Sequence, residues 1–203
     1  MSLAIALVGL EPASETSLTT HMVQHVILMV VAAPLLALGA PRVIQYLPAA
    51  IRKTLGSVSG SAWGVWAGLA VLAQAVAMVV WHLPEPFEAA ARHDIVHAAE
   101  HLSLLGTSLL LWWVVFEGRR AHVGLAIGAM FAAALVCTAL GAAIALAGHT
   151  WYPAYRSLSD QQMAGVVMWS LGGVAYLVGA VVLFFTWLTN LERSAPGGLV
   201  TSA

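Results

Sequence analysis

The sequence predicts an all-α integral membrane protein, a bundle of about five transmembrane helices. Of its 203 residues, 61% are hydrophobic and 8% are charged, and the mean hydropathy is +0.88. Soluble chains carry about 25% charged residues, so an ordinary soluble domain is excluded. The apolar residues also fall into five stretches near the length of about 20 residues that a span needs.

The five expected spans follow one another along the whole chain. They cover residues 22–39, 61–81, 97–116, 122–148 and 163–188. Proline, glycine and charged residues interrupt the chain between them, at residues 41–60, 83–86, 117–120 and 152–160. Because the sequence contains no repeat or low-complexity tract, we expect one transmembrane domain over residues 1–203.

Composition excludes several functions. The formal charge of −1 leaves no basic surface for nucleic acid, and one cysteine allows no disulfide framework. No nucleophile–base set or phosphate-binding loop is present, so the sequence predicts that the protein is not an enzyme. Residues 1–10 are apolar but too short to span, and we expect them to lie at the outer surface.

Positive charge predicts the orientation of the bundle. Two of the eight Lys and Arg residues, Arg92 and Arg156, fall on one side of the predicted membrane. The other six fall on the opposite side: Arg42, Arg52, Lys53, Arg119, Arg120 and Arg193. Short cytoplasmic loops are rich in these residues, which predicts an outer N-terminus and a cytoplasmic C-terminus.

Histidines gather at the predicted outer face. The chain has eight, and only His122 falls on the cytoplasmic side. The other seven lie at the outer ends of four spans: His21, His25, His82, His93, His97, His101 and His149. Polar residues are costly within spans and are usually functional there, so this clustering predicts a binding site.

The spacing of these histidines indicates metal binding. His21 and His25 are four residues apart and project from one side of a helix, as do His97 and His101. Imidazole together with thioether suits copper, particularly Cu(I), and the thioethers near these histidines are those of Met22, Met29, Met163 and Met168. Glu100 and Asp94 are placed to orient the imidazoles through their second ring nitrogens. We expect metal affinity to weaken as pH falls, because imidazole must be neutral to bind a metal and becomes protonated in acid.

Three further features have structural interpretations. Cys137 is expected to be an inert thiol in the middle of the fourth span. The spacing of Gly64 with Gly68, and of Gly124 with Gly128, favours close helix packing, either within the chain or against a partner. Asp160 is placed to cap the fifth helix.

Several sequence blocks together resemble the caa3-type cytochrome c oxidase assembly factors called CtaG. They are HMVQH at 21–25, WHLP at 81–84, HAAEH at 97–101, YPAY at 152–155 and DQQMAG at 160–165. The blocks occur in order across residues 21–190, and as a set they are specific. His149 falls in none of them.

The resemblance implies a multispanning protein that helps mature the copper centres of haem-copper oxidases. It points to six metal-binding residues: His21, Met22, His25, His82, His97 and His101. It further implies the bacterial cytoplasmic (inner) membrane, with lipid, oxidase subunits of the respiratory chain and a copper donor protein as partners. Such a chaperone would bind copper transiently, without redox turnover.

Two alternatives stay open. Histidines on facing helices ligate haem b in membrane cytochromes, although pairs on one helix face do not suit bis-histidine ligation. The chain is also small enough to be a non-catalytic accessory subunit of a respiratory oxidase. A visible spectrum separates haem from copper, and stable copurification with an oxidase identifies a permanent subunit.

Overall fold

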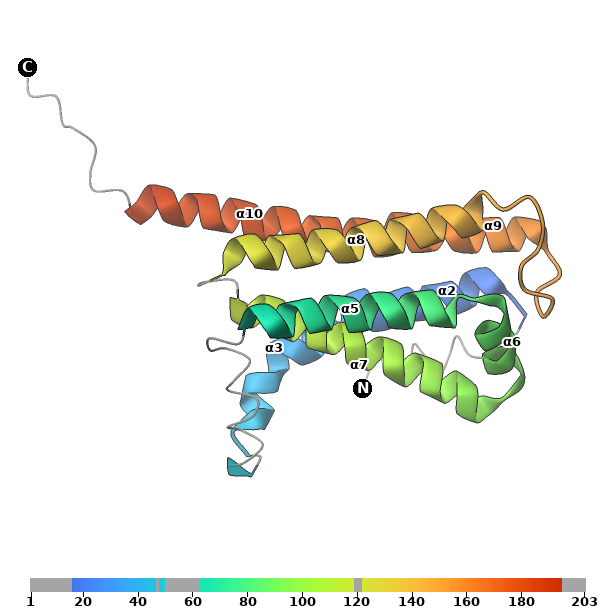
Figure 1. The fold of residues 1–203 in the computed structure, drawn as a ribbon, viewed down its shortest axis with the longest axis horizontal. Coiled ribbons are helices and arrows are strands. Elements are labelled where there is room, and N and C mark those ends of the chain that lie inside the picture. Colours follow the sequence, from blue (N-terminus) through green and yellow to red (C-terminus); the bar gives the residue numbers. More distant parts are fainter. Residues whose placement is uncertain (1–15, 47, 50–62, 119–121, 195–203) are drawn as a thin grey trace, which may run out of the picture.

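A computed structural model describes residues 16–46, 48–49, 63–118 and 122–194. Within these ranges the chain is helical, and the long helices run along one common axis (Figure 1). Five of the helices are long and apolar enough to cross a membrane. The predicted fold class, an all-helical membrane protein with five spans, is therefore confirmed.

The first and fifth spans each contain a short π-helical segment. The elements in chain order are α2 (Leu18–Ile27), η1 (Leu28–Ala32), α3 (Ala33–Ile44), α5 (Trp63–Trp81), α6 (Pro84–Arg92), α7 (Asp94–Gly118), α8 (Val123–Ala145), α9 (Leu158–Val167), η3 (Met168–Gly173) and α10 (Val174–Ser194). The continuous spans are Leu18–Ala40, Trp63–Trp81, Asp94–Gly118, Val123–Ala145 and Leu158–Glu192.

Several span boundaries differ from the prediction; the fourth span ends earlier, at Ala145, and the fifth ends later, at Glu192. The first, third and fifth helices begin earlier than expected, at Leu18, Asp94 and Leu158. Their first turns carry polar residues, which hydropathy excludes from a span but which extend a helix as well as apolar ones do. A helix satisfies its backbone hydrogen bonds internally, so it continues past the hydrophobic stretch. The predicted boundary at residue 61 lies outside the described residues.

The break expected at residues 83–86 is the start of a helix. Leu83 is extended, with φ −70° and ψ 145°, as residues before proline prefer. Pro84 then begins α6, since proline is well suited to the first helical position. Phe87 and Ala90 of this short helix are buried. The helix lies across one end of the bundle, where it positions the site described below (Figure 1).

A π-helical segment accommodates a proline in the first span. In η1 the backbone N–H of Ala33 bonds to the carbonyl of Leu28, five residues back. Pro34 follows and has no N–H to donate, which weakens the helix locally. Figure 1 shows α3 turning away from the bundle beyond this point. Proline and π-helical segments are two of the usual causes of helix kinks, and both are present at this change of direction.

Close packing of α8 against the fifth span depends on Gly141 and Gly165. A Cβ on Gly141 would lie 2.7 Å from the backbone nitrogen of Trp169, and one on Gly165 would lie 2.6 Å from the carbonyl oxygen of Gly141. By contrast, a Cβ on Gly64, Gly68, Gly124 or Gly128 would meet nothing within 4 Å. The predicted glycine motifs therefore make no close contact among the described residues. Residues of both motifs line an open apolar groove of about 450 Å³ between α5 and α8.

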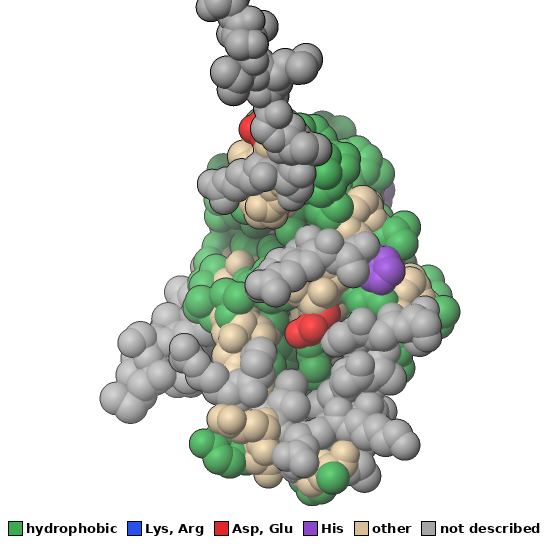
Figure 2. Space-filling view, turned by 90° about the vertical axis from the view of Figure 1, so that its left-hand side faces the viewer, with side chains coloured by type: hydrophobic (Ala, Val, Ile, Leu, Met, Phe, Trp, Pro, Cys, Tyr) green, Lys and Arg blue, Asp and Glu red, His purple; other side chains and the backbone are tan. Residues whose placement is uncertain are grey.

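Large apolar side chains cover the flanks of the bundle. Val65, Leu102 and Phe185 are 57–68% exposed. Figure 2 views the end that carries His122, where described hydrophobic side chains are visible between the grey residues. The exposed apolar side chains of the flanks suit contact with lipid, as multi-pass insertion requires. Which end faces outward stays a prediction, and Arg52, Lys53, Arg119 and Arg120, on which it depends, lie outside the described residues.

Candidate metal centre

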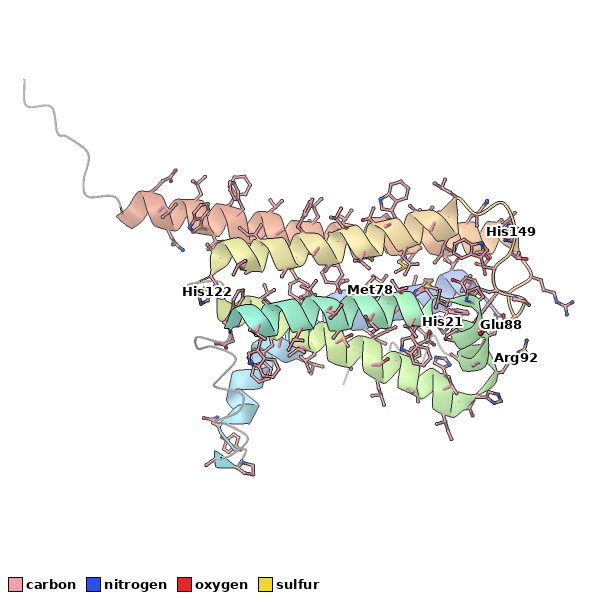
Figure 3. The ribbon with its side chains drawn as sticks, in the orientation of Figure 1. His21, Met78, Glu88, Arg92, His122 and His149 are labelled. Atoms are coloured by element: carbon pink, nitrogen blue, oxygen red, sulfur yellow. The ribbon has the colours of Figure 1, made fainter. Side chains whose placement is uncertain are left out.

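Five histidines converge at one end of the bundle. α2 contributes His21 and His25, α7 contributes His97 and His101, and the turn between α5 and α6 contributes His82. The i,i+4 spacing places each pair on the side of its helix that faces the other. His21 and His122 mark opposite ends of the molecule in Figure 3. His122 stacks on Trp63, with ring centroids 4.9 Å apart.

The imidazole rings are in direct contact across the helices. The ring centroid of His21 lies 5.2 Å from that of His97 and 5.6 Å from that of His101. His25 lies 5.1 Å from His101 and 5.6 Å from His82. Within α7 the Nε2 atoms of His97 and His101 are 3.1 Å apart. The predicted clustering of these five residues in space is thus present.

Glu100 lies among these rings. Its side chain is fully buried, and its two carboxylate oxygens each lie 3.5 Å from an Nε2 atom, one of His21 and the other of His25. One ligand atom from each of His21, His97, Glu100 and His101 fits within 4.8 Å of the others. Three imidazoles and a carboxylate at this separation have the size and chemistry of a metal-binding site.

His82 presents its Nε2 atom to the cluster in a defined tautomer. Its Nδ1 lies 2.7 Å from the carbonyl oxygen of Met78, so Nδ1 donates its proton to that carbonyl. The Nε2 lone pair is therefore free to bind a metal. Burial lowers the pKa of His82 to about 4, although the bond to Met78 opposes this shift. His82 is neutral at physiological pH, which is the form that metals require.

Several buried polar atoms of the cluster lack hydrogen bonds. Within the described residues, both ring nitrogens of His25, Nε2 of His82 and both carboxylate oxygens of Glu100 are buried without a hydrogen-bond partner. The 3.5 Å contact of Glu100 with His25 is longer than a normal hydrogen bond. Unsatisfied buried polar atoms are costly, so their concentration here supports the binding of a metal ion.

Aromatic residues close the site at the end of the bundle. Phe87 of α6 and Tyr155 of the loop before α9 lie 5.2 Å and 6.5 Å from the ring of His21. Tyr152 packs on Phe87 and donates its hydroxyl hydrogen to the carbonyl of His82 at 2.8 Å. Burial raises the pKa of Tyr152, so the hydroxyl stays protonated and keeps this bond. The imidazoles are therefore screened from water on this side.

Asp160 fixes the start of the helix that carries His21 and His25. Its carboxylate accepts hydrogen bonds from the backbone N–H of Leu18 at 2.7 Å and from the Thr19 hydroxyl at 2.6 Å. The prediction that Asp160 caps its own helix is wrong, because Ser157 is the N-cap of α9. Asp160 sits three residues after that cap, where its side chain is directed across the interface to α2.

The remaining predicted residues fall into two groups. Met22 is buried and directly follows His21 in the sequence. Because successive helical residues point about 100° apart, the Met22 side chain does not point in the same direction as that of His21. Its role as a ligand stays a prediction. His93, His149 and Asp94 are exposed, and none belongs to the group of close ligand atoms found among the described residues. Asp94 lies in the first turn of α7, so the orienting role expected for it is not supported.

Sequence reasoning treated Glu100 only as an orienting group and did not include it among the ligands. The HAAEH block carries the signal that places it in the site. Glu100 is three residues after His97, so the two side chains share one face of α7. Its complete burial could not be derived from that spacing, because it depends on α2 packing over it.

Comparison with known proteins identifies one family. Residues 1–190 match the model of the cytochrome c oxidase caa3 assembly factor family, Caa3_CtaG. The match covers most of the chain and includes every residue of the histidine cluster. Neither curated proteins nor solved structures gave a significant match.

Proposed function

We propose that this chain, which belongs to the cytochrome c oxidase caa3 assembly factor family, binds copper at the histidine cluster and delivers it to a haem-copper oxidase. Membership of this family supports a role in oxidase assembly, and it supports a role that is not catalytic. The cargo, its ligands and the direction of transfer are what we propose. The bacterial cytoplasmic membrane is the compartment that such a role requires.

The observation that carries the proposal is the convergence of imidazoles at one end of the bundle. Nitrogen atoms of His25 and His82 and the carboxylate of Glu100 are buried there without hydrogen bonds from the described residues. A cation held by Glu100 with His21, His97 and His101, whose ligand atoms lie within 4.8 Å of one another, would satisfy the carboxylate, and the unpaired nitrogens of His25 and His82 lie beside this group. Among first-row divalent metals, copper binds nitrogen sites most tightly, so the donor set is compatible with this cargo.

The cluster offers more donor atoms than one copper ion needs. Its five imidazoles and one carboxylate come from two helices and a turn, with ring contacts in several orientations. An ion bound by some of these groups can exchange one imidazole for another as it enters or leaves. Such exchange suits a protein that must release its cargo, whereas a closed set of four ligands would retain it.

The position of the cluster suits delivery to an oxidase. On the predicted orientation it lies towards the outer side of the membrane, where the catalytic copper of haem-copper oxidases is expected. A donor at similar depth could pass copper to the client without moving the ion across the bilayer. Oxidase subunits are therefore the expected acceptor, and a copper protein outside the membrane is the expected donor.

The haem alternative is less well supported. Bis-histidine ligation requires the macrocycle to lie between two axial imidazoles from facing helices. Here rings from facing helices contact one another directly, and the Glu100 carboxylate lies among them. A permanent place in the oxidase complex is compatible with copper binding, and copurification at fixed stoichiometry after assembly would identify it.

The test combines metal analysis with three variants. Purified protein is loaded with copper in detergent, and metal content and the visible spectrum are measured on one sample. We expect bound copper in the wild type, and loss of binding and of oxidase copper loading in His25→Ala and His101→Ala. His122→Ala is the matched control, because His122 lies at the opposite end.

Two results would contradict the proposal. One is copper at background level in wild-type protein that retains its helical content. The other is an equal loss of oxidase activity in all three variants at equal protein levels. A Soret band and α band in the reduced-minus-oxidised spectrum would instead support haem.

A further inference from the structure

A layer of methionines lies one helical turn beneath the histidine cluster. His25 and Met29 are four residues apart on the first span, and His82 and Met78 are four residues apart at the end of α5. Residues at this spacing share a helix face. Because the rings of His25 and His82 are only 5.6 Å apart, the two faces oppose each other. Each carries an imidazole at the end of the bundle and a thioether farther in.

A hydrogen bond fixes the direction of the Met29 side chain. Its sulfur accepts a bond from Nε2 of Gln74 at 3.3 Å. Gln74 is four residues before Met78, so Gln74, Met78 and His82 form one stripe along α5. The Met29 sulfur therefore faces the stripe that carries Met78. Gln74 is itself held by hydrogen bonds from the hydroxyls of Thr107 and Ser108.

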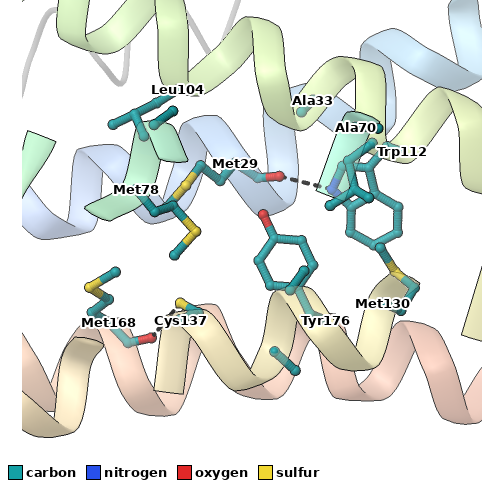
Figure 4. Packing of buried hydrophobic residues seen from close by; sticks show 14 of the residues in the cluster. Met29, Ala33, Ala70, Met78, Leu104, Trp112, Met130, Cys137, Met168 and Tyr176 are labelled. Atoms are coloured by element: carbon teal, nitrogen blue, oxygen red, sulfur yellow. Dashed lines mark hydrogen bonds between the residues drawn. The ribbon is translucent and has the colours of Figure 1, made fainter. Parts of the chain in front are cut away.

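Further sulfur atoms face these two from the other side of the bundle. Figure 4 shows the Met29 side chain beside that of Met78, and the Met78 side chain extending towards Met168 and Cys137. The Cys137 thiol donates to the carbonyl of Met168 at 3.4 Å. All four residues are at most 1% exposed and belong to one buried cluster. They come from four different segments: η1, α5, α8 and η3.

Both π-helical segments place a methionine in this layer. Met29 lies in η1 and Met168 is the first residue of η3. Their carbonyl oxygens accept bonds from side chains, Nε1 of Trp112 at 2.9 Å and Sγ of Cys137 at 3.4 Å. π-helical segments within α-helices are frequent at functional sites. The backbone is thus altered at two of the positions that supply sulfur.

We infer that Met29, Met78 and Met168 form a Cu(I)-selective site beneath the histidine cluster, and this inference rests on the proposed function. Thioether is a soft, neutral ligand that selects Cu(I) over divalent cations. A monovalent ion with neutral ligands is also the copper species least costly to hold within a membrane. The imidazoles would receive Cu(I) at the outer end, and the thioethers would hold the same ion one turn deeper with no change of oxidation state.

The test uses X-ray absorption on the full chain in detergent, loaded with Cu(I) under reducing conditions. We expect sulfur scatterers beside nitrogen or oxygen scatterers in the wild type. In Met29→Leu and Met78→Leu, which conserve side-chain volume, we expect the sulfur signal to fall. Affinity for Ag(I), a redox-inert probe of Cu(I) sites, should fall by more than about tenfold in these variants.

Met130→Leu is the matched control, since Met130 is equally buried but packs near Trp112 and Gly179. Nitrogen and oxygen scatterers alone in wild type would overturn this inference and leave the proposed function standing. Equal Ag(I) affinity in all three variants would overturn it as well. Loss of all copper binding from wild type would reject both proposals. The wild-type spectrum gives a result even if a variant fails to fold.

Discussion

Glu100 is a buried carboxylate that lies between two imidazoles of the cluster. Its side chain is fully buried, yet no hydrogen bond from the described residues reaches its oxygens. Two imidazole nitrogens lie 3.5 Å away. A buried carboxylate is costly unless it is paired or binds a metal. We therefore interpret Glu100 as the group that compensates the charge of a cation among the imidazoles.

Replacing Glu100 with glutamine tests this interpretation. Glu100→Gln keeps the size of the side chain but removes its charge, so the fold should persist while copper affinity falls by about 10–100-fold. Affinity is measured by competition against a chelator. Asp94→Asn is the control, since Asp94 is an exposed acid on the same helix. Unchanged affinity in Glu100→Gln would remove the carboxylate from the site.

His82 makes the stability of the metal-free protein depend on pH. Burial lowers its folded-state pKa to about 4, whereas the unfolded value is about 6.5. The unfolded state therefore takes up a proton first as pH falls. Stability that is present above about pH 6.5 should be lost progressively towards pH 4, by at most roughly 3 kcal/mol from this residue. Thermal unfolding in detergent across this range measures the loss.

His82→Gln separates this contribution from that of other groups. Glutamine does not titrate, so the variant should lose less stability than wild type between about pH 6.5 and 4. Parallel curves for the two proteins would show that His82 does not titrate as its burial implies. Copper affinity should also fall in acid, but His82 contributes little to that fall above pH 5, because it is already neutral.

At the scale of helices, Asp160 connects the first and fifth spans. It accepts hydrogen bonds at the start of α2 from Ser17, Leu18 and Thr19. Asp160→Ala removes these acceptors, and we expect the free energy of unfolding to fall by about 1–2 kcal/mol, similar to the loss when a helix N-cap side chain is removed. The lower midpoint of thermal unfolding should be accompanied by weaker copper binding, since α2 carries His21 and His25. Arg156→Gln, at an exposed neighbour, should change neither property.

Glycines at helix contacts provide a second prediction at this scale. Gly165→Ala would push a Cβ to 2.6 Å from the carbonyl oxygen of Gly141, so α8 and α9 must separate. We expect destabilisation of about 1–3 kcal/mol, as for other overpacked sites. Gly68→Ala should be tolerated, because its Cβ would meet nothing within 4 Å. Equal melting temperatures for the two variants would contradict the packing described here.

For the molecule as a whole, orientation in the membrane decides where copper is handled. The charge asymmetry predicts that the histidine cluster faces outward. Cys137 is buried, so new cysteines at exposed positions can be labelled selectively in intact cells. A membrane-impermeant maleimide should label Ala154→Cys near the cluster and leave Glu192→Cys at the other end unlabelled. The reverse pattern would place the cluster at the cytoplasmic face.

Local sequence determined the spans and the helix faces of the candidate site. Hydropathy gave five membrane helices, because backbone hydrogen bonding in lipid leaves a long apolar segment few alternatives to a helix. The i,i+4 spacing of the histidines placed each pair on one face, since that follows from helix geometry. These properties depend only on residues near one another in the chain, and they were predictable for that reason.

Contacts between distant residues were decided only by the tertiary structure. The spacing of the glycines did not reveal that Gly141 and Gly165 make the close contact while Gly64 and Gly68 face an open groove. The position of Asp160 in the sequence did not show that its carboxylate accepts hydrogen bonds at the start of α2 instead of capping its own helix. The burial of Glu100 between imidazoles likewise requires α2 and α7 to meet. Each outcome depends on which faces pack together and in what register, and that is set by the combined packing of all the helices.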